Sequence, residues 1–234
     1  MSDINGYRHP AEGINPPRIF PGYESTIKRG PKQPLVKVEP TLSEITGPSL
    51  GKEHLRPGDL DMTHYNGGEA VGQRIIVTGH ILDEDGRPVR DALLEIWQAN
   101  SCGRYHNDGD QHDAPLDPHF YGKGAVVTDA NGEYRFVTIK PGAYPWRNHY
   151  NAWRPNHIHY SIFGAGLATR LITQMYFSGD PLLPLDPIFN SVPDTQARQR
   201  LLADLDMSVT VPESALGYRF DIVLRGRNAT PTGI

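Results

Sequence analysis

The 234-residue sequence predicts an all-β fold, an antiparallel β-sandwich with an extended N-terminal arm and one or two short helices. Short runs of β-branched and aromatic residues recur at intervals of about 10–25 residues, and Gly- and Asp-containing turns separate them. The 24 glycines and 21 prolines favour many turns and few long helices. We expect residues 1–73 to form the arm and its loops, with a short helix, and residues 74–234 to form one sandwich domain that carries the function.

Composition and charge exclude several classes of protein. Hydrophobic residues make up 38% of the chain and charged residues 21%, which suits a packed core and argues against disorder. The net charge of −4 gives no indication of a nucleic-acid or membrane-surface protein. No run approaches about 18 consecutive apolar residues, and the N-terminus lacks the features of a signal peptide. We therefore expect a cytoplasmic protein, and its single cysteine, Cys102, fits a reducing compartment.

The N-terminal third differs from the rest of the chain in composition and in hydrophobic pattern. Residues 1–40 are rich in Pro, Gly and charge and lack periodicity, so we expect an extended arm. This arm is either disordered or lies across a partner, and its apolar residues favour the second. Thr41 and Glu44 have the spacing of a capping box, which predicts one short helix that ends near Thr46. Residues 50–73 are expected to be loop.

From Arg74 onward, β-branched and aromatic segments alternate with turn residues. The Asp-Gly turn at 83–86 and the Asn-Gly turn at 130–132 each predict a β-hairpin between the flanking strands. Residues 194–205 predict the best helix of the sequence, with Asp194 as its N-cap. The expected strands are 74–82, the second half of 89–98, 124–129, 133–139, 157–163, 170–177 and 218–226.

The sharpest chemical pattern is His157-Ile158-His159 in one of these strands. Residues i and i+2 of a strand share a face, with Cα atoms roughly 6–7 Å apart, which suits two ligands of one metal ion. A His-x-His pair alone is a weak signal. Its apolar flank, however, makes it costly in free energy to bury imidazoles without a partner, and a bound metal removes that cost. The shortage of cysteine excludes a thiolate zinc site. Fe(II) held by both histidines and a distant carboxylate stays open.

Two tyrosines offer a second kind of donor. Tyr105 follows the strand that ends at Gln98, and Tyr144 stands in a Pro-Gly-Ala-Tyr-Pro loop before the histidines. Phenolate is a hard anionic ligand that favours a trivalent ion, and such an ion lowers the phenol pKa from its ordinary value of about 10. Each tyrosine alone is better explained as a ring packed at a loop corner. Together with the two histidines, the pair favours Fe(III).

Fold by itself leaves the function open. The stretch from Gly79 to Tyr144 resembles the prealbumin-like sandwich modules, which are often non-catalytic accessory domains. A non-catalytic sandwich subunit or ligand-binding module is therefore an alternative.

A more specific resemblance covers most of the chain, about residues 20–226. It rests on the segments 97–105, 114–120, 128–148, 153–160 and 171–182. These segments resemble the protocatechuate 3,4-dioxygenase beta-subunit family of the intradiol ring-cleaving dioxygenases. That family implies a non-haem Fe(III) held by Tyr105, Tyr144, His157 and His159. The 13-residue gap between Tyr144 and His157 (157 − 144) resembles the protocatechuate branch more than the catechol or hydroxyquinol branches.

The resemblance also implies a reaction, partners and further site residues. The reaction is cleavage of protocatechuate with O₂ to 3-carboxy-cis,cis-muconate, in the β-ketoadipate pathway of aromatic catabolism. The partner is a homologous alpha subunit in an αβ hetero-oligomer. Arg154 is expected to stabilise developing negative charge, Gln174 to lie near the site and Tyr144 to leave the iron when substrate binds. Trp146 and Tyr23 are expected to line the substrate pocket, Tyr23 only if the arm folds back. A catechol or hydroxyquinol intradiol dioxygenase is the alternative within the family.

Overall fold

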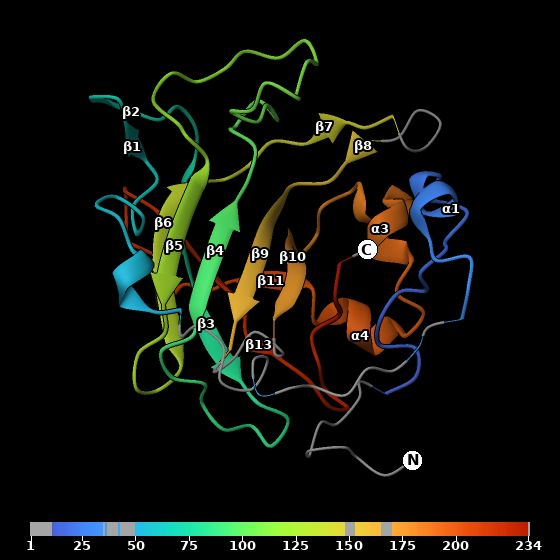
Figure 1. Cartoon of the computed structure of the whole chain (residues 1–234). Coiled ribbons are helices and arrows are strands. Elements are labelled where there is room, and N and C mark those ends of the chain that lie inside the picture. Colours follow the sequence, from blue (N-terminus) through green and yellow to red (C-terminus); the bar gives the residue numbers. More distant parts are fainter. Residues whose placement is uncertain are drawn as a thin grey trace.

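Two layers of β-strands pack face to face and form the body of the molecule (Figure 1). The structure is a computed structural model and describes residues 11–34, 36, 42, 50–147, 153–164 and 170–233. Its strands are β1 (His64–Tyr65), β2 (Gly68–Glu69), β3 (Arg74–Leu82), β4 (Leu93–Trp97), β5 (Lys123–Val127), β6 (Glu133–Ile139), β7 (Tyr144–Pro145), β8 (Trp153–Arg154), β9 (His157–Phe163), β10 (Leu171–Phe177), β11 (Leu202–Leu205), β12 (Leu216–Arg219) and β13 (Ile222–Val223).

The two layers are joined through one strand. In the first layer β5, β4, β9 and β10 pair in that order, and every pairing is antiparallel. β11 is parallel to β10 and antiparallel to β12, so the strand order continues into the second layer. There β3 pairs antiparallel with β6 and parallel with β12 and β13. The predicted all-β sandwich is confirmed, and its three parallel pairings make the sheet mixed.

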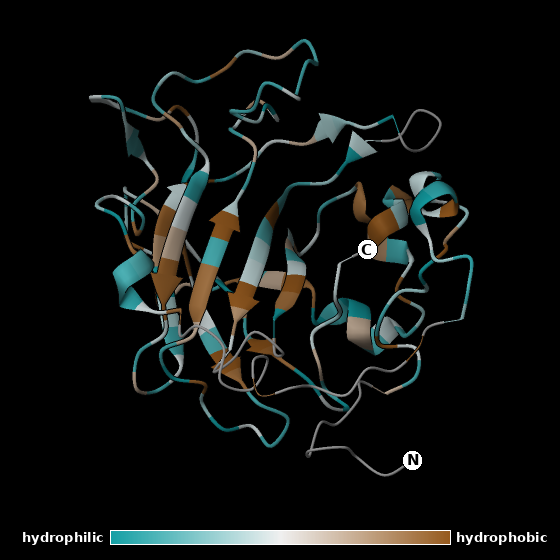
Figure 2. Ribbon diagram, viewed as in Figure 1, coloured by the Kyte–Doolittle hydropathy of each residue, from teal (hydrophilic) through white to brown (hydrophobic). Residues whose placement is uncertain are grey.

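The space between the layers is filled by alternate residues of the facing strands. Ile75 and Val77 of β3, Leu94 of β4 and Ile158 and Tyr160 of β9 are fully buried in one cluster. Each such side chain contributes about 1.5–3 kcal/mol relative to exposure. Figure 2 shows the hydrophobic colouring concentrated on these strands. The period-2 pattern that predicted the strands is thus the pattern of this core.

The two glycine turns are present, but the strands that they join do not pair with each other, apart from an isolated antiparallel bridge between Leu82 and Pro88 beside the first turn. Asp83 accepts the backbone N–H of Arg87 at 2.9 Å, and Asp129 accepts that of Glu133 at 2.8 Å, so the local turn chemistry is as predicted. Yet β3 pairs with β6, and β4 pairs with β5. The predicted pairing of the flanking strands is therefore wrong, because each turn carries the chain from one layer to the other. A turn motif fixes the reversal of the chain, whereas burial of apolar faces selects the partner strand.

The helix expected at 194–205 is only partly correct. Asp194 does cap helix α4 (Thr195–Gln199), because its Oδ1 accepts the backbone N–H of Gln196 at 2.8 Å. The helix then ends, and Leu202–Leu205 form β11. Pairing with β10 on one side and β12 on the other satisfies the backbone of this segment and overrides its helical propensity.

Two further segments depart from prediction. The strand expected at 218–226 is split into β12 and β13, with Phe220 and Asp221 between them. The loop expected at 50–73 contains the 3-10 helix η2 (Lys52–His54) and the short strands β1 and β2. The capping-box helix predicted from Thr41 and Glu44 falls outside the described residues.

Short helices gather beside β10 (Figure 1). They are α1 (Ser25–Arg29), the 3-10 helix η4 (Leu183–Leu185), α3 (Pro187–Asn190) and α4. The last three contribute residues to a second, smaller core. No helix in the described part of the chain has the length and apolar character needed to cross a membrane.

The described part of the N-terminal arm packs against the rest of the same chain. Ile14 is 1% exposed and packs in the second core. The carbonyl of Gly13 accepts the N–H of Asp194 at 3.1 Å, and the Asn15 side chain accepts the N–H of Thr232 at 3.0 Å. The arm therefore folds back toward the sandwich over residues 11–34.

Candidate active site

The two histidines of β9 share one face of the sheet, as the strand period predicts. Their ring centroids are 4.8 Å apart. His159 lies opposite Trp97 of β4 and Gln174 of β10, and the indole of Trp97 stacks on its imidazole at 4.8 Å and 4°. The Nδ1 of His157 lies 2.7 Å from the carbonyl oxygen of Pro155, so Nδ1 carries the proton and Nε2 presents its lone pair. Both imidazoles are thereby held in fixed orientations.

The two tyrosines predicted from sequence converge on these imidazoles. The phenol oxygen of Tyr105 lies 3.0 Å from His159 Nε2, and that of Tyr144 lies 3.2 Å from His157 Nε2. The two phenol rings are 5.5 Å apart and meet edge to face. Two oxygen and two nitrogen donors, from three separate segments of the chain, thus face one small volume.

Glycine allows the two tyrosine-bearing loops to approach each other. A Cβ on Gly103 would lie 2.2 Å from the carbonyl oxygen of Ala143, and one on Gly142 would lie 2.4 Å from that of Ser101. Gly103 also has φ of +81°, which other residues rarely adopt. The Tyr105 loop is held further by its backbone N–H, which Asp110 accepts at 2.9 Å. The spacing between the phenol oxygens depends on this contact between backbones.

Burial sets the charge state of the donors. It raises the pKa of Tyr105 well above its ordinary value, with the neighbouring Tyr144 adding to the shift. It also raises the pKa of Tyr144, and the Arg154 cation partly offsets the rise. Burial and then Arg154 lower the pKa of His157 well below its usual range and that of His159 to about 3. Without a metal all four donors are therefore neutral near pH 7.

This donor set suits a trivalent ion better than a divalent ion with a carboxylate. Ionised Tyr105 and Tyr144 would supply two negative charges, and His157 and His159 two neutral nitrogens, next to a cation that the buried site could not otherwise solvate. In the described ranges no cluster of three or more His, Cys, Asp or Glu side chains is placed to hold a metal. That finding counts against a site of two histidines and a carboxylate among these residues.

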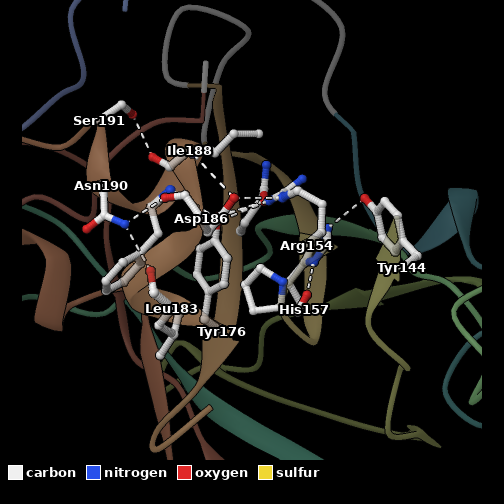
Figure 3. Close-up of polar contacts among 12 residues, drawn as sticks. Tyr144, Arg154, His157, Tyr176, Leu183, Asp186, Ile188, Asn190 and Ser191 are labelled. Atoms are coloured by element: carbon white, nitrogen blue, oxygen red, sulfur yellow. Dashed lines mark hydrogen bonds and ion pairs between the residues drawn. The ribbon is translucent and has the colours of Figure 1, made fainter. Parts of the chain in front are cut away.

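Arg154 lies beside two of the donors, Tyr144 and His157, in a buried polar network (Figure 3). It stands on β8, paired with Tyr144 of β7, and its side chain is 3% exposed. Its guanidinium donates to Asp186 Oδ1 at 3.0 Å, to Gln174 Oε1 at 2.5 Å and to the hydroxyl oxygen of Tyr176 at 3.1 Å. Its carbon Cζ lies 5.4 Å from the Trp146 ring centroid. The cation is therefore fixed beside Tyr144.

A cavity of about 560 Å³ opens beside this network, which is a normal size for a small-molecule site. Tyr23, Trp146 and Arg154, which the family resemblance assigned to substrate binding, all line it. Tyr144 and His159, which it assigned to the metal, and Gln174 line it too. Tyr23 reaches it because the arm folds back, and its ring meets Trp146 edge to face at 4.7 Å. Tyr105 and His157 do not line the cavity, but they contact His159 and Tyr144, which do. Trp97, Arg170 and Ile188 also line it.

Sequence reasoning missed Trp97, Tyr176 and Asp186. Tyr176 could have been found, since it lies directly opposite His157 across β9 and β10. Asp186-Pro187 carries the signal of a helix start, an N-cap residue followed by Pro at the first helical position. That signal gave no indication that the carboxylate would also meet Arg154, which is 32 residues away in sequence.

Comparison with known proteins identifies the chain's relatives. A family model described as "Dioxygenase" matches residues 45–226, and one for the N-terminal part of the protocatechuate 3,4-dioxygenase beta subunit matches residues 7–41. The protocatechuate 3,4-dioxygenase beta chain of Burkholderia cepacia is 55% identical over 219 residues, 93% of each chain. The protocatechuate 3,4-dioxygenase alpha chain of Pseudomonas putida is 31% identical over 163 residues, 69% of this chain and 76% of that one.

A solved structure agrees with the fold and with these relatives. The 3-chlorocatechol 1,2-dioxygenase of Rhodococcus opacus 1CP superposes with a TM-score of 0.55 at 25% sequence identity. The similarity covers 70% of this chain and 63% of that one.

Proposed function

We propose that this chain, which belongs to the intradiol ring-cleavage dioxygenase family, is the iron-bearing beta subunit of a protocatechuate 3,4-dioxygenase. The reaction is cleavage of protocatechuate by O₂ between its two hydroxylated carbons, which gives 3-carboxy-cis,cis-muconate. The observation that carries the proposal is the convergence of Tyr105, Tyr144, His157 and His159, two of which, Tyr144 and His159, line the substrate-sized cavity. The 55% identity over 93% of the chain favours protocatechuate over catechol or hydroxyquinol as substrate.

The four donors are the residues that would hold a non-haem Fe(III). Intradiol dioxygenases use non-haem iron, and two phenolates with two imidazoles fit the trivalent state. When bound, such an ion would be chelated by the two substrate oxygens and would make the aromatic ring reactive toward O₂.

Tyr144 and Arg154 prepare the substrate for that chelation. The phenol oxygen of Tyr144 lies at the cavity wall, where as a phenolate it can accept a proton from a substrate hydroxyl. The guanidinium of Arg154 adds a fixed positive charge beside that oxygen. Such a charge stabilises negative charge as it develops on the substrate, without reorganisation during the reaction.

The aromatic residues form the other walls. Trp146 lies over Arg154 and against Tyr23, so a flat aromatic ring can lie along its face. We assign to the hydroxyl of Tyr23, which lines the same cavity, a contact with a polar ring substituent, which in protocatechuate is the carboxylate. Gln174 accepts from Arg154 and acts as a positioning residue.

The assembly follows from the family. We assign a homologous alpha subunit as partner, with which the chain forms an αβ hetero-oligomer, since the relatives of this chain include both beta and alpha chains. The compartment we assign is the cytoplasm.

The test combines iron content, visible spectrum and oxygen uptake, measured on the purified protein with any subunit that copurifies. Phenolate coordination predicts one iron per chain and a wine-red colour whose absorption changes on anaerobic addition of protocatechuate. Oxygen uptake should be faster with protocatechuate than with catechol or hydroxyquinol. An iron-loaded but colourless protein would contradict the two tyrosine ligands. An iron-free, inactive protein would point to a non-catalytic sandwich, and uptake that is faster with catechol or hydroxyquinol to another intradiol branch.

A further inference from the structure

The carboxylate of Asp186 lies at the centre of the network under the pocket and is fully buried. Its two oxygens accept from Arg154, Oδ1 from Nε at 3.0 Å and Oδ2 from Nη2 at 3.4 Å. They also accept the backbone N–H groups of Ile188 at 3.4 Å and Phe189 at 3.2 Å, at the start of α3. One side chain therefore fixes both a buried cation and the first turn of a helix.

The hydrogen bonds of Arg154 engage one edge of its guanidinium. Nε and Nη2 bond to Asp186, and Nη2 also bonds to Gln174 and Tyr176. Figure 3 shows Tyr144 on the side of Arg154 opposite to Asp186. The anchored edge thus faces the carboxylate, while the cation presents its charge toward the phenol and the cavity.

Helix α3 connects the same carboxylate to the cavity wall. Ile188 lines the cavity, and Phe189 packs against Tyr176 with ring centroids 5.3 Å apart. Tyr176 in turn lies 5.8 Å from the ring of His157. A movement of Asp186 would therefore displace the cation and Ile188 together.

We propose that Asp186 is a positioning residue for ring cleavage, which sets the place of the Arg154 charge relative to Tyr144 and the bound substrate. This inference rests on the proposed function. Its physical basis is that a buried guanidinium without its carboxylate either moves toward solvent or stays as an uncompensated charge. A displacement of about 1 Å in a catalytic group can cost about 100-fold in rate.

The Asp186→Asn variant separates this role from helix capping. Asparagine has nearly the same shape and caps helices as well as aspartate does, so α3 should persist. It carries no negative charge, and its amide nitrogen would place a donor against the donors of Arg154. Asp194 provides a matched control, since it caps α4 through the N–H groups of Gln196 and Ala197 in the same backbone conformation and forms no ion pair with Arg154.

The kinetic experiment is a cycle of four proteins: wild type, Asp186→Asn, Arg154→Ala and the double variant, with Asp194→Asn alongside. Asp186→Asn should keep its iron and lower kcat between about 10- and 100-fold, while KM for protocatechuate changes by less than about threefold. In the Arg154→Ala background the same substitution should change kcat by less than about twofold, because Arg154 is the group through which Asp186 acts. Asp194→Asn should match wild type.

Thermal unfolding of the iron-free proteins gives a readout that does not depend on turnover. Asp186→Asn alone should unfold at a lower temperature than the double variant, because it keeps a buried cation without a counter-charge. If the changes in unfolding temperature of the two single variants add up to that of the double variant, the two residues are not energetically coupled.

The inference is overturned by a normal kcat in Asp186→Asn, by an equal loss in the Arg154→Ala background, or by additive unfolding temperatures. A loss of kcat in Asp194→Asn equal to that in Asp186→Asn would also overturn it, because it would assign the effect to helix capping. Wild-type protein without iron or oxygen uptake would refute the proposed function itself. The Asp186 role would fall with it, and thermal coupling would then describe only a structural ion pair.

Discussion

Ile14 provides the sharpest test of how the N-terminal arm serves the site. Its side chain is 1% exposed and packs in the small core with Tyr176, Phe189 and Leu201. It lies nine residues before Tyr23, which lines the substrate cavity (23 − 14). We predict that Ile14→Ala releases the described part of the arm, residues 11–34, and so removes Tyr23 from the cavity wall.

The size of the effect follows from burial. Truncating a fully buried isoleucine to alanine costs about 2–5 kcal/mol. If that cost falls on docking of the arm, the population with the arm undocked rises by about 30-fold at the lower end, since each 1.4 kcal/mol is a factor of ten. The remaining contacts of the arm, such as the Gly13 carbonyl to the Asp194 N–H and Asn15 to the Thr232 N–H, are hydrogen bonds worth about 0.5–1.5 kcal/mol each.

Limited trypsin digestion and steady-state kinetics measure the two consequences. Cleavage after Arg18, Lys28 or Arg29 should accelerate in proportion to the undocked population. KM for protocatechuate should rise while kcat stays near wild type, because the four proposed metal donors are untouched. Ile27→Ala is the control, since Ile27 is 54% exposed on α1 and its truncation should change stability by at most about 0.5 kcal/mol. Wild-type cleavage rates and KM in Ile14→Ala would refute this account of the arm.

Four further substitutions test the metal donors and the sandwich. Tyr144→Phe should retain iron but lose most turnover, because the proton acceptor at the cavity wall is gone; oxygen uptake with iron analysis checks this. His159→Ala should lose both iron and colour, measured by metal analysis and the visible spectrum. Gly79→Ala should prevent normal folding, because its Cβ would lie 1.9 Å from the backbone oxygen of Phe220; circular dichroism checks this. Tyr134→Phe should cost about 1–3 kcal/mol in chemical denaturation, since its buried hydroxyl donates to that same oxygen at 2.6 Å.

The sequence was sufficient to predict those elements that depend only on residues close together in the chain. The strands around the first core follow from their period-2 patterns, and the start of α4 follows from Asp194. The two histidine donors could be predicted for the same reason: a strand places His157 and His159 on one face whatever its neighbours are. Tyr105 and Tyr144 needed the family resemblance, because loop residues carry no periodicity that predicts their direction.

What the sequence did not predict depends on contacts between distant segments. The residues after Gln199 continue a helical pattern, yet pairing with β10 and β12 makes Leu202–Leu205 a strand. The hairpin turns are correct as turns, but the strands they join belong to opposite layers. Asp186 shows the same limit at the site, because only the folded chain brings its carboxylate to Arg154.

The ion pair between Asp186 and Arg154 is difficult to explain as a device for stability. Both side chains are nearly excluded from solvent, and removing two charges from water costs several kcal/mol per ion before their attraction offsets it. Apolar residues of similar volume would often serve a core as well or better. The pair lies, however, between the cavity and α3, where Gln174 and Tyr176 complete its hydrogen bonds. A site that must stabilise negative charge on a bound aromatic needs a cation that neither moves nor is screened by water, and a buried carboxylate is what keeps such a cation in place.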